Sequence, residues 1–135
     1  NTDYSVTYPH NTKVVFVDEK FIPVPYDFDM AGFVNTSYSV VSQTRKEKLP
    51  IEEVTERYYM GYQRDYKLFE QVRQEFITHK QDLLAVIKEH ESYFENNKNY
   101  STAKNYIEDF FRIIAKEAAF KKSTYDRALK MKSTP

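Results

Sequence analysis

Four oxygen-bearing side chains that could bind a metal ion lie in the first quarter of the chain. They are Asp3, Asn11, Asp27 and Asp29. Carboxylate and carboxamide oxygens are the ligands that Mg²⁺ and Mn²⁺ prefer, and magnesium keeps coordination positions for phosphate oxygens. Phosphoryl transfer needs such a set, because one Asp orients the attacking hydroxyl while an Asn and a second Asp hold the metal. The residue types therefore favour metal-dependent phosphate chemistry.

A predicted β-hairpin lies between these residues and would bring them together. Residues 12–17 and 21–26 are rich in β-branched and aromatic side chains, and a short charged turn separates them. Because a hairpin returns the chain to its starting point, we expect the polar residues before it to meet the acidic residues after it. Pro23 and Pro25 lack backbone donors, so the second strand should lie at an edge or pair through alternate residues only.

Asp27 and Asp29 alternate with apolar residues, which would place both carboxylates on one face of an extended segment. Two like charges on one face repel each other unless a positive group or a hydrogen-bond donor lies between them. The partner could be a metal ion, an arginine such as Arg45 or Arg57, or a group of backbone amides. Any one of these Asp and Asn residues could also be a simple turn or capping residue, since its side chain accepts from nearby amides.

An Asp, an Asn, a hairpin and a further Asp follow one another here in the order found in the catalytic half of protein-kinase-like folds. Residues 1–3 (NTD) with His10 and Asn11 resemble the catalytic loop of these enzymes. Residues 26–32 (YDFDMAG) resemble the metal-binding segment of aminoglycoside phosphotransferases and spore-coat-type kinases. The stretch 1–61, which includes HNTKVV and LPIEEVTERYYMG, is similar to a family of uncharacterised bacterial proteins with kinase-like motifs.

The resemblance implies a role for each of the four residues. Asp3 would orient the acceptor hydroxyl, and Asn11 would bind a metal. Asp27 would be the principal metal ligand, with Asp29 as a second one. The resemblance also implies Mg²⁺ or Mn²⁺ and ATP as cofactors, and a missing N-terminal lobe of the same protein as the partner of this chain. Members of this family often look exported, which favours an extracytoplasmic location.

The kinase pattern is incomplete in this chain. Asp3 and Asn11 are farther apart than the Asp and Asn of the usual kinase loop, and Asp29 stands where typical protein kinases have Gly. No Gly-rich loop and no strand Lys precede the segment, although both are needed to hold the nucleotide phosphates. We therefore expect the chain to be inactive alone and the intact protein to be a phosphotransferase or a degenerate relative. The alternative is a non-catalytic helical interaction module.

Helical periodicity dominates the rest of the chain. After a polar loop over residues 30–50, we expect a short helix over residues 51–59. Asp65 should cap a long helix, and Ser101 or Thr102 should cap a third helix that pairs antiparallel with it. Apolar residues at three- and four-residue intervals are expected to form the core of these helices, namely Phe69, Val72, Phe76, Leu83, Val86 and Ile87, with Tyr106, Ile107, Phe110, Ile114 and Ala118.

The composition is that of one domain, or part of one, of the mostly helical α+β class. The chain has 135 residues, a formal charge of zero and no cysteine. Balanced charge gives no general attraction to nucleic acid or anionic membranes, and no apolar run approaches the roughly 20 residues that span a bilayer. We expect residues 1–50 to form the hairpin and acidic loop, and residues 51–135 to form a three- to four-helix bundle. By resemblance, the two segments together would be a kinase-like C-lobe.

Overall fold

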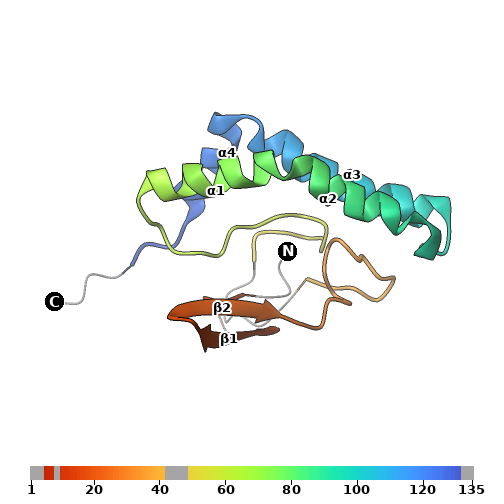
Figure 1. Cartoon of the computed structure of the whole chain (residues 1–135), viewed down its shortest axis with the longest axis horizontal. Helices are drawn as coiled ribbons and strands as arrows, with labels where there is room; N and C mark the ends of the chain where they lie inside the picture. The colour runs from red at the N-terminus through yellow and green to blue at the C-terminus, as the bar shows by residue number, and fades with distance from the viewer. Residues whose placement is uncertain (1–4, 8–9, 42–48, 132–135) are drawn as a thin grey trace. The chain divides into compact units, whose positions relative to one another are not determined.

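The computed structural model describes residues 5–7, 10–41 and 49–131 (Figure 1). Asp3 and Arg45 lie outside these ranges. The described residues form four α-helices and one two-stranded antiparallel sheet, which confirms the mostly helical α+β class. The chain divides into two compact units. The first unit contains residues 1–62 with 129–135 and holds the sheet, whereas the second contains residues 63–128 and holds the four helices.

The sheet of the first unit is the hairpin predicted from the sequence. Strand β1 spans Thr12–Val17 and strand β2 spans Lys20–Pro25. The two residues between the strands, Asp18 and Glu19, both have a positive φ, of 48° and 60°. This combination is that of a type I′ turn, whose backbone twist matches the twist of the flanking strands. The geometry of the turn therefore matches that of the hairpin.

The register of the hairpin explains how β2 accommodates two prolines. A two-residue turn makes the pair that flanks it, Val17 with Lys20, a hydrogen-bonded pair, and bonded pairs then alternate with non-bonded pairs along the strands. Pro23 and Pro25 both fall in non-bonded pairs. Their missing N–H groups lie on the outer edge of β2, so no bond between the strands is lost. The expected pairing through alternate residues is confirmed.

The helix predicted over residues 51–59 is wrong, because this segment folds into turns instead. The Glu56 carboxylate accepts hydrogen bonds from the backbone N–H groups of Glu52, at 2.6 Å, and Glu53, at 3.0 Å. These bonds lower the pKa of the Glu56 carboxyl, and they compete with the backbone bonds of a helix. Ile51 and Val54, which lie in this segment, are buried.

Gly61 allows the end of this segment to close on itself. A Cβ atom at this position would lie 2.4 Å from the hydroxyl oxygen of Tyr59, so a side chain would displace the tyrosine ring. The carbonyl of Gly61 accepts a hydrogen bond from the N–H of Leu129 at 2.9 Å, beside a parallel bridge between Tyr62 and Leu129. Residues near the end of the chain are thereby joined to the first unit.

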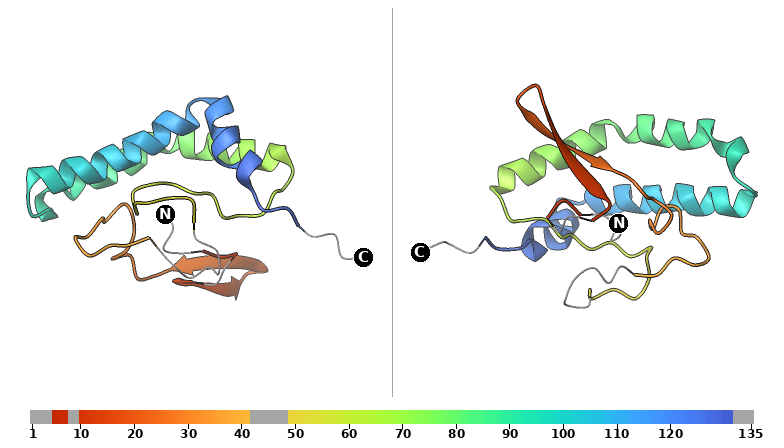
Figure 2. Two further views of the ribbon diagram at one scale, coloured as in Figure 1. Left: turned by 180° about the vertical axis from the view of Figure 1, so that it is seen from behind. Right: turned by 90° about the horizontal axis from the view of Figure 1, so that it is seen from below.

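The second unit consists of four α-helices (Figure 2). This number agrees with the three to four helices expected from the sequence. Asp65 caps the first helix as predicted, because its side chain accepts a hydrogen bond from the N–H of Lys67 at 2.9 Å. The long helix expected after this cap is divided at His79, whose ψ of 11° departs from helical geometry. The helices are α1 (Tyr66–Thr78), α2 (Lys80–Glu89), α3 (Asn97–Ile114) and α4 (Glu117–Ser123), with 3-10 turns at Glu91–Tyr93 and Tyr125–Arg127.

The cap predicted for α3 is wrong, because the helix begins earlier than Ser101 or Thr102. Asn96 is the N-cap residue, and its side chain accepts a hydrogen bond from the N–H of Asn99 at 2.9 Å. Asn is as strong a cap as Ser, so the helix starts at the earlier of these capping residues. The helix ends at Ile114, and Ala118 therefore belongs to α4 rather than to α3.

Helix α3 runs antiparallel to α1 and α2, as predicted for helices joined by a short connection (Figure 2). Phe76 of α1 meets Phe110 of α3 edge to face, with ring centroids 5.1 Å apart. Near the turn, Phe94 and Tyr100 make a similar contact at 5.6 Å. The apolar residues buried in this unit are Phe69, Ile87, Ala103, Phe111, Ile114 and Phe120.

Part of the predicted core is wrong, because α1 and α2 carry two apolar stripes and only one of them is buried. Phe69 and Ile87 belong to the buried stripe. The second stripe lies beside it and remains 41–53% exposed. The apolar period predicts the helices correctly, but a helix that packs on one side against α3 buries only the side chains on that face. The second stripe consists of Leu68, Val72, Leu83 and Val86, whereas Phe76, which is 43% exposed, reaches Phe110 of α3 from between the two stripes.

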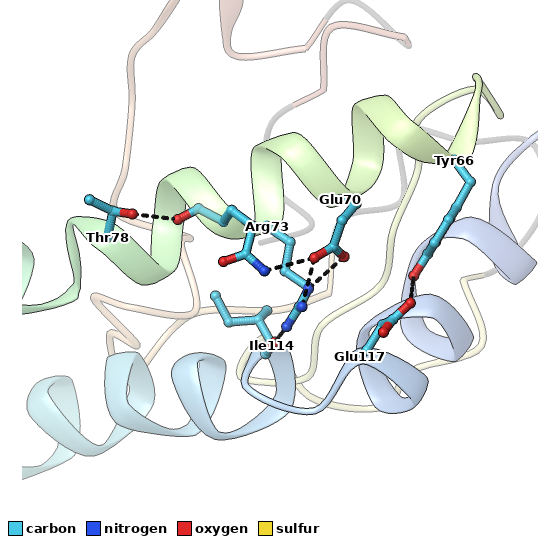
Figure 3. A network of polar contacts seen from close by, with 7 residues as sticks. Tyr66, Glu70, Arg73, Thr78, Ile114 and Glu117 are labelled. Carbon is cyan, nitrogen blue, oxygen red and sulfur yellow. Dashed lines mark hydrogen bonds and ion pairs between the residues drawn. The ribbon is translucent and has the colours of Figure 1, made fainter.

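A buried arginine joins α1 to the end of α3 (Figure 3). Arg73 is only 8% exposed. Its guanidinium donates to the two carboxylate oxygens of Glu70, each at 2.7 Å, and to the carbonyl of Ile114 at 2.8 Å. Ile114 is the last residue of α3, where carbonyls lack a partner within the helix. Arg73 therefore satisfies a helix end while Glu70 balances its buried charge.

Replacing Arg73 with Ala should lower the free energy of unfolding by about 3 kcal/mol, because both Glu70 and the Ile114 carbonyl lose their partner. Urea denaturation followed by circular dichroism measures this change. Arg112→Ala is the matched control, since Arg112 pairs with Asp109 on the exposed surface of α3. That variant should cost less than about 0.5 kcal/mol. Equal losses in the two variants would contradict the assignment.

Glu70 should make the stability of the chain depend on acid pH. The hydrogen bonds from Arg73 and Gln74 lower the pKa of its carboxyl from 4.5 to about 2. A carboxyl whose pKa falls on folding stabilises the native state above its ordinary pKa, and this contribution is lost as the pH falls through the folded value. The free energy of unfolding should therefore fall between about pH 4.5 and pH 2. Urea titrations across this range should show a smaller fall for Glu70→Gln, and an unchanged slope would refute the coupling.

Candidate functional site

The open end of the hairpin brings Asn11 beside the segment that carries Asp27. The N–H of Tyr26 donates to the carbonyl of Asn11 at 2.9 Å, which continues the ladder one pair beyond the strands. Asn11 and Asp27 both have a left-handed backbone, with φ of 46° and 61°. Asn and Asp tolerate this conformation because their short polar side chains bond to nearby backbone. The hairpin thus joins the two segments at the backbone, as the sequence predicted.

Asp27 does not continue the extended course of β2. Its positive φ turns the backbone at the first residue after the last bonded pair, and its side chain is exposed. The alternation that was expected to set Asp27 and Asp29 on one face of an extended segment is therefore interrupted at Asp27 itself. The relation between these two carboxylates is set by the loop and not by a strand.

Asp29 is half-buried and is held by its own loop. One oxygen of its carboxylate accepts a hydrogen bond from the N–H of Met30 at 2.9 Å. Its backbone carbonyl accepts from the hydroxyls of Thr36 and Ser39, each at 3.2 Å, and these two hydroxyl oxygens lie 2.6 Å apart. A backbone amide is therefore one partner of this carboxylate, which is one of the alternatives left open by the sequence. The two hydroxyls fix the position of Asp29.

The oxygen donors near the open end of the hairpin suit a hard cation in type. Asn11 offers a carboxamide oxygen, Asp27 a carboxylate, and Asp29 a carboxylate with one oxygen already accepting from Met30. In the described part of the chain, no group of three or more His, Cys, Asp or Glu side chains could hold a metal ion. A site here would therefore combine few protein ligands with water or phosphate oxygens, as magnesium sites commonly do.

A half-open hollow of about 280 Å³ lies beside this loop in the first unit. Ser39, whose hydroxyl donates to the carbonyl of Asp29, lies on its wall. Two carboxylates, of Glu52 and Glu53, also belong to the lining and would repel the phosphates of a nucleotide. The hollow is therefore a poor site for ATP. Its lining consists of Asn35, Ser39, Val40, Val41, Glu52, Glu53, Val54 and Thr55.

Comparison of the chain with protein-family models, with curated proteins and with solved structures finds no match. Function must therefore be inferred from the chemistry of the chain itself. Of the helices in the described ranges, none combines the length and the apolar character needed to cross a membrane.

Proposed function

We propose that the intact protein is a metal-dependent phosphotransferase, or a degenerate relative of one, and that this chain carries part of its metal site. In this proposal Asn11 and Asp27 bind the metal, and Asp29 contributes a further oxygen. Asp3 orients the hydroxyl of the acceptor. Mg²⁺ or Mn²⁺, when bound, would neutralise charge on the phosphate oxygens of ATP.

The observation that carries this proposal is the pair of left-handed residues at the open end of the hairpin. Asn and Asp adopt this conformation more readily than other residues, because their short polar side chains bond to nearby backbone. Asn11 and Asp27 lie on either side of the backbone hydrogen bond between Asn11 and Tyr26. One oxygen-bearing side chain from the segment before β1 and one from the segment after β2 therefore lie at the same end of the hairpin.

The remaining parts of a phosphotransferase site would come from the N-terminal lobe that the resemblance implies. This chain has no Gly-rich loop to hold the triphosphate, and the carboxylates near Asp29 would repel it. The chain alone is therefore proposed to bind the cation weakly and not to turn over ATP.

Addition of Mn²⁺ to the ¹⁵N-labelled chain should broaden the amide signals of Asn11, Tyr26 and Asp27 before others, because a paramagnetic ion relaxes the nuclei nearest to it. Asp27→Asn should remove this selective broadening. Asp18→Asn is the matched control, since Asp18 is also an aspartate with positive φ but lies at the opposite end of the hairpin. Similar effects of both substitutions, or broadening spread over acidic residues in general, would refute the proposed site.

A second candidate function, a non-catalytic interaction module, is favoured by the exposed apolar surface. Phe16 and Phe21 contact each other with ring centroids 4.9 Å apart, yet they are 63% and 77% exposed. A two-stranded hairpin has too little core to bury such residues, and exposed aromatic side chains are typical of a segment that packs against another polypeptide. The exposed apolar residues of the hairpin are Val14, Val15, Phe16, Val17, Phe21, Ile22 and Val24.

The double substitution Phe16→Ser and Phe21→Ser should reduce the fluorescence of a bound hydrophobic dye such as ANS, because it removes the two largest exposed rings of the hairpin. The helical circular dichroism should stay unchanged. Tyr93→Ser is the control, because Tyr93 is an 83% exposed aromatic residue in the helical unit. Equal dye fluorescence in the double variant and in the unaltered chain would remove the support for a hairpin binding surface.

A further inference from the structure

A row of acidic side chains borders the exposed apolar stripe of the helical unit. Glu75, Asp82 and Glu89 follow one another at seven-residue intervals. Seven residues are close to two turns of an α-helix, so the three carboxylates lie along one line. Glu75 comes one turn after Val72, and Glu89 comes one turn after Val86, which places this line beside the stripe. The stripe therefore has an acidic border.

The stripe and its border continue across the division between α1 and α2. The N–H of His79 donates to the carbonyl of Glu75, and the N–H of Leu83 donates to the carbonyl of His79, each at 3.1 Å. These bonds join residues four apart, as in an α-helix, so the helical spacing is kept. Helix α2 continues the course of α1 (Figure 1, Figure 2). From Leu68 to Val86 the two helices thus present one face, roughly 27 Å long.

The charge of the border is not balanced by cations of the same helices. Asp82 pairs with His79 at 2.9 Å, whereas Glu75 and Glu89 form no ion pair with any residue that the structure describes. All three acidic side chains are exposed. No Lys or Arg stands three or four residues from any of them, which are the positions that meet on a helix surface. The border therefore offers carboxylates to a basic partner.

The spacing and the charge of the row together define what could cover this face. The carboxylates repeat roughly every 10 Å along the axis, as do side chains seven residues apart on another helix. Side chains on one face of a strand repeat about every 7 Å and would fall out of step. An anionic membrane surface would be repelled by the row. A second copy in antiparallel orientation would set one acidic border against the other. A basic helix meets none of these objections.

We propose that the face of α1 and α2 binds an amphipathic helix of a partner protein. The apolar side chains of this helix cover the stripe of Leu68, Val72, Leu83 and Val86. Its Lys or Arg residues, at seven-residue intervals along one side, lie against the acidic border. Recognition of a helix by an apolar face with a charged rim is a common mode of binding between proteins. The face belongs to the helical unit, so this binding is independent of the metal site proposed on the hairpin.

A synthetic amphipathic peptide of leucine and lysine is the probe for this face. The peptide is about 18 residues long, which matches the face, and its lysines stand at seven-residue intervals beside a leucine stripe. Fluorescence anisotropy of the labelled peptide, titrated with the full chain, should show saturable binding of one peptide per chain. A peptide with glutamate in place of each lysine should bind about tenfold more weakly. Equal binding of the two peptides, or no binding of the lysine peptide, overturns the proposal.

Substitutions in the stripe test where the peptide binds. Val72→Ser combined with Leu83→Ser should weaken binding of the lysine peptide by about tenfold, because two apolar contacts are lost. Ile22→Ser combined with Val24→Ser is the matched control, since these hairpin side chains are similarly exposed, at 43% and 44%. The control should leave the affinity unchanged, and the helical circular dichroism of both variants should stay that of the unaltered chain. Equal losses in the two double variants overturn the proposal.

Substitutions in the border test the charge. Glu75→Gln combined with Glu89→Gln should weaken binding of the lysine peptide by about fivefold, and the loss should shrink at high salt. Glu108→Gln is the control, because this carboxylate pairs with Lys104 on α3 and should not affect binding. An unchanged affinity in the double variant overturns the role of the border. Sedimentation of the chain alone should show a monomer, and a dimer that Val72→Ser with Leu83→Ser dissociates would mean that a second copy covers the face, which also overturns the proposal.

Discussion

The two-residue turn at the tip of the hairpin is the constraint on which the first unit depends. Because both residues of the turn have a positive φ, the strands leave it with matching twist, and the register is fixed from the turn outwards. A slip of one residue would move Pro23 and Pro25 into bonded pairs and would separate Asn11 from Tyr26. The approach of Asn11 to the segment that carries Asp27 therefore depends on this turn.

The second unit depends on a polar contact inside an apolar interface. Helix α3 ends at Ile114, and α4 begins at Glu117 in a new direction, which leaves a helix-end carbonyl near the core. Arg73 reaches this carbonyl from α1, and Glu70 keeps the guanidinium paired on its other side. Nearby, the Tyr66 hydroxyl donates to Glu117 at 3.2 Å, so the first turn of α4 is also joined to α1 (Figure 3).

The metal proposal concerns side chains at the open end, where Asn11 and Asp27 hold left-handed backbone. Of the candidate metal residues, the sequence predicted the approach of Asn11 to the Asp27 segment because a hairpin closes its own ends. It did not predict the hydroxyls that hold Asp29, since seven- and ten-residue separations follow no local pattern.

The sequence by itself determined the elements whose signals are local. The β-branched runs and the alternate prolines specified the hairpin, and Asp65 specified the start of α1. Only the tertiary structure decided that residues 51–59 form turns, because the Glu56 carboxylate competes there with helical backbone bonds. It also decided which of two apolar stripes on α1 and α2 is buried, and why Arg73 lies in the core. Periodicity records that a face is apolar, but its burial depends on whether another element packs against that face.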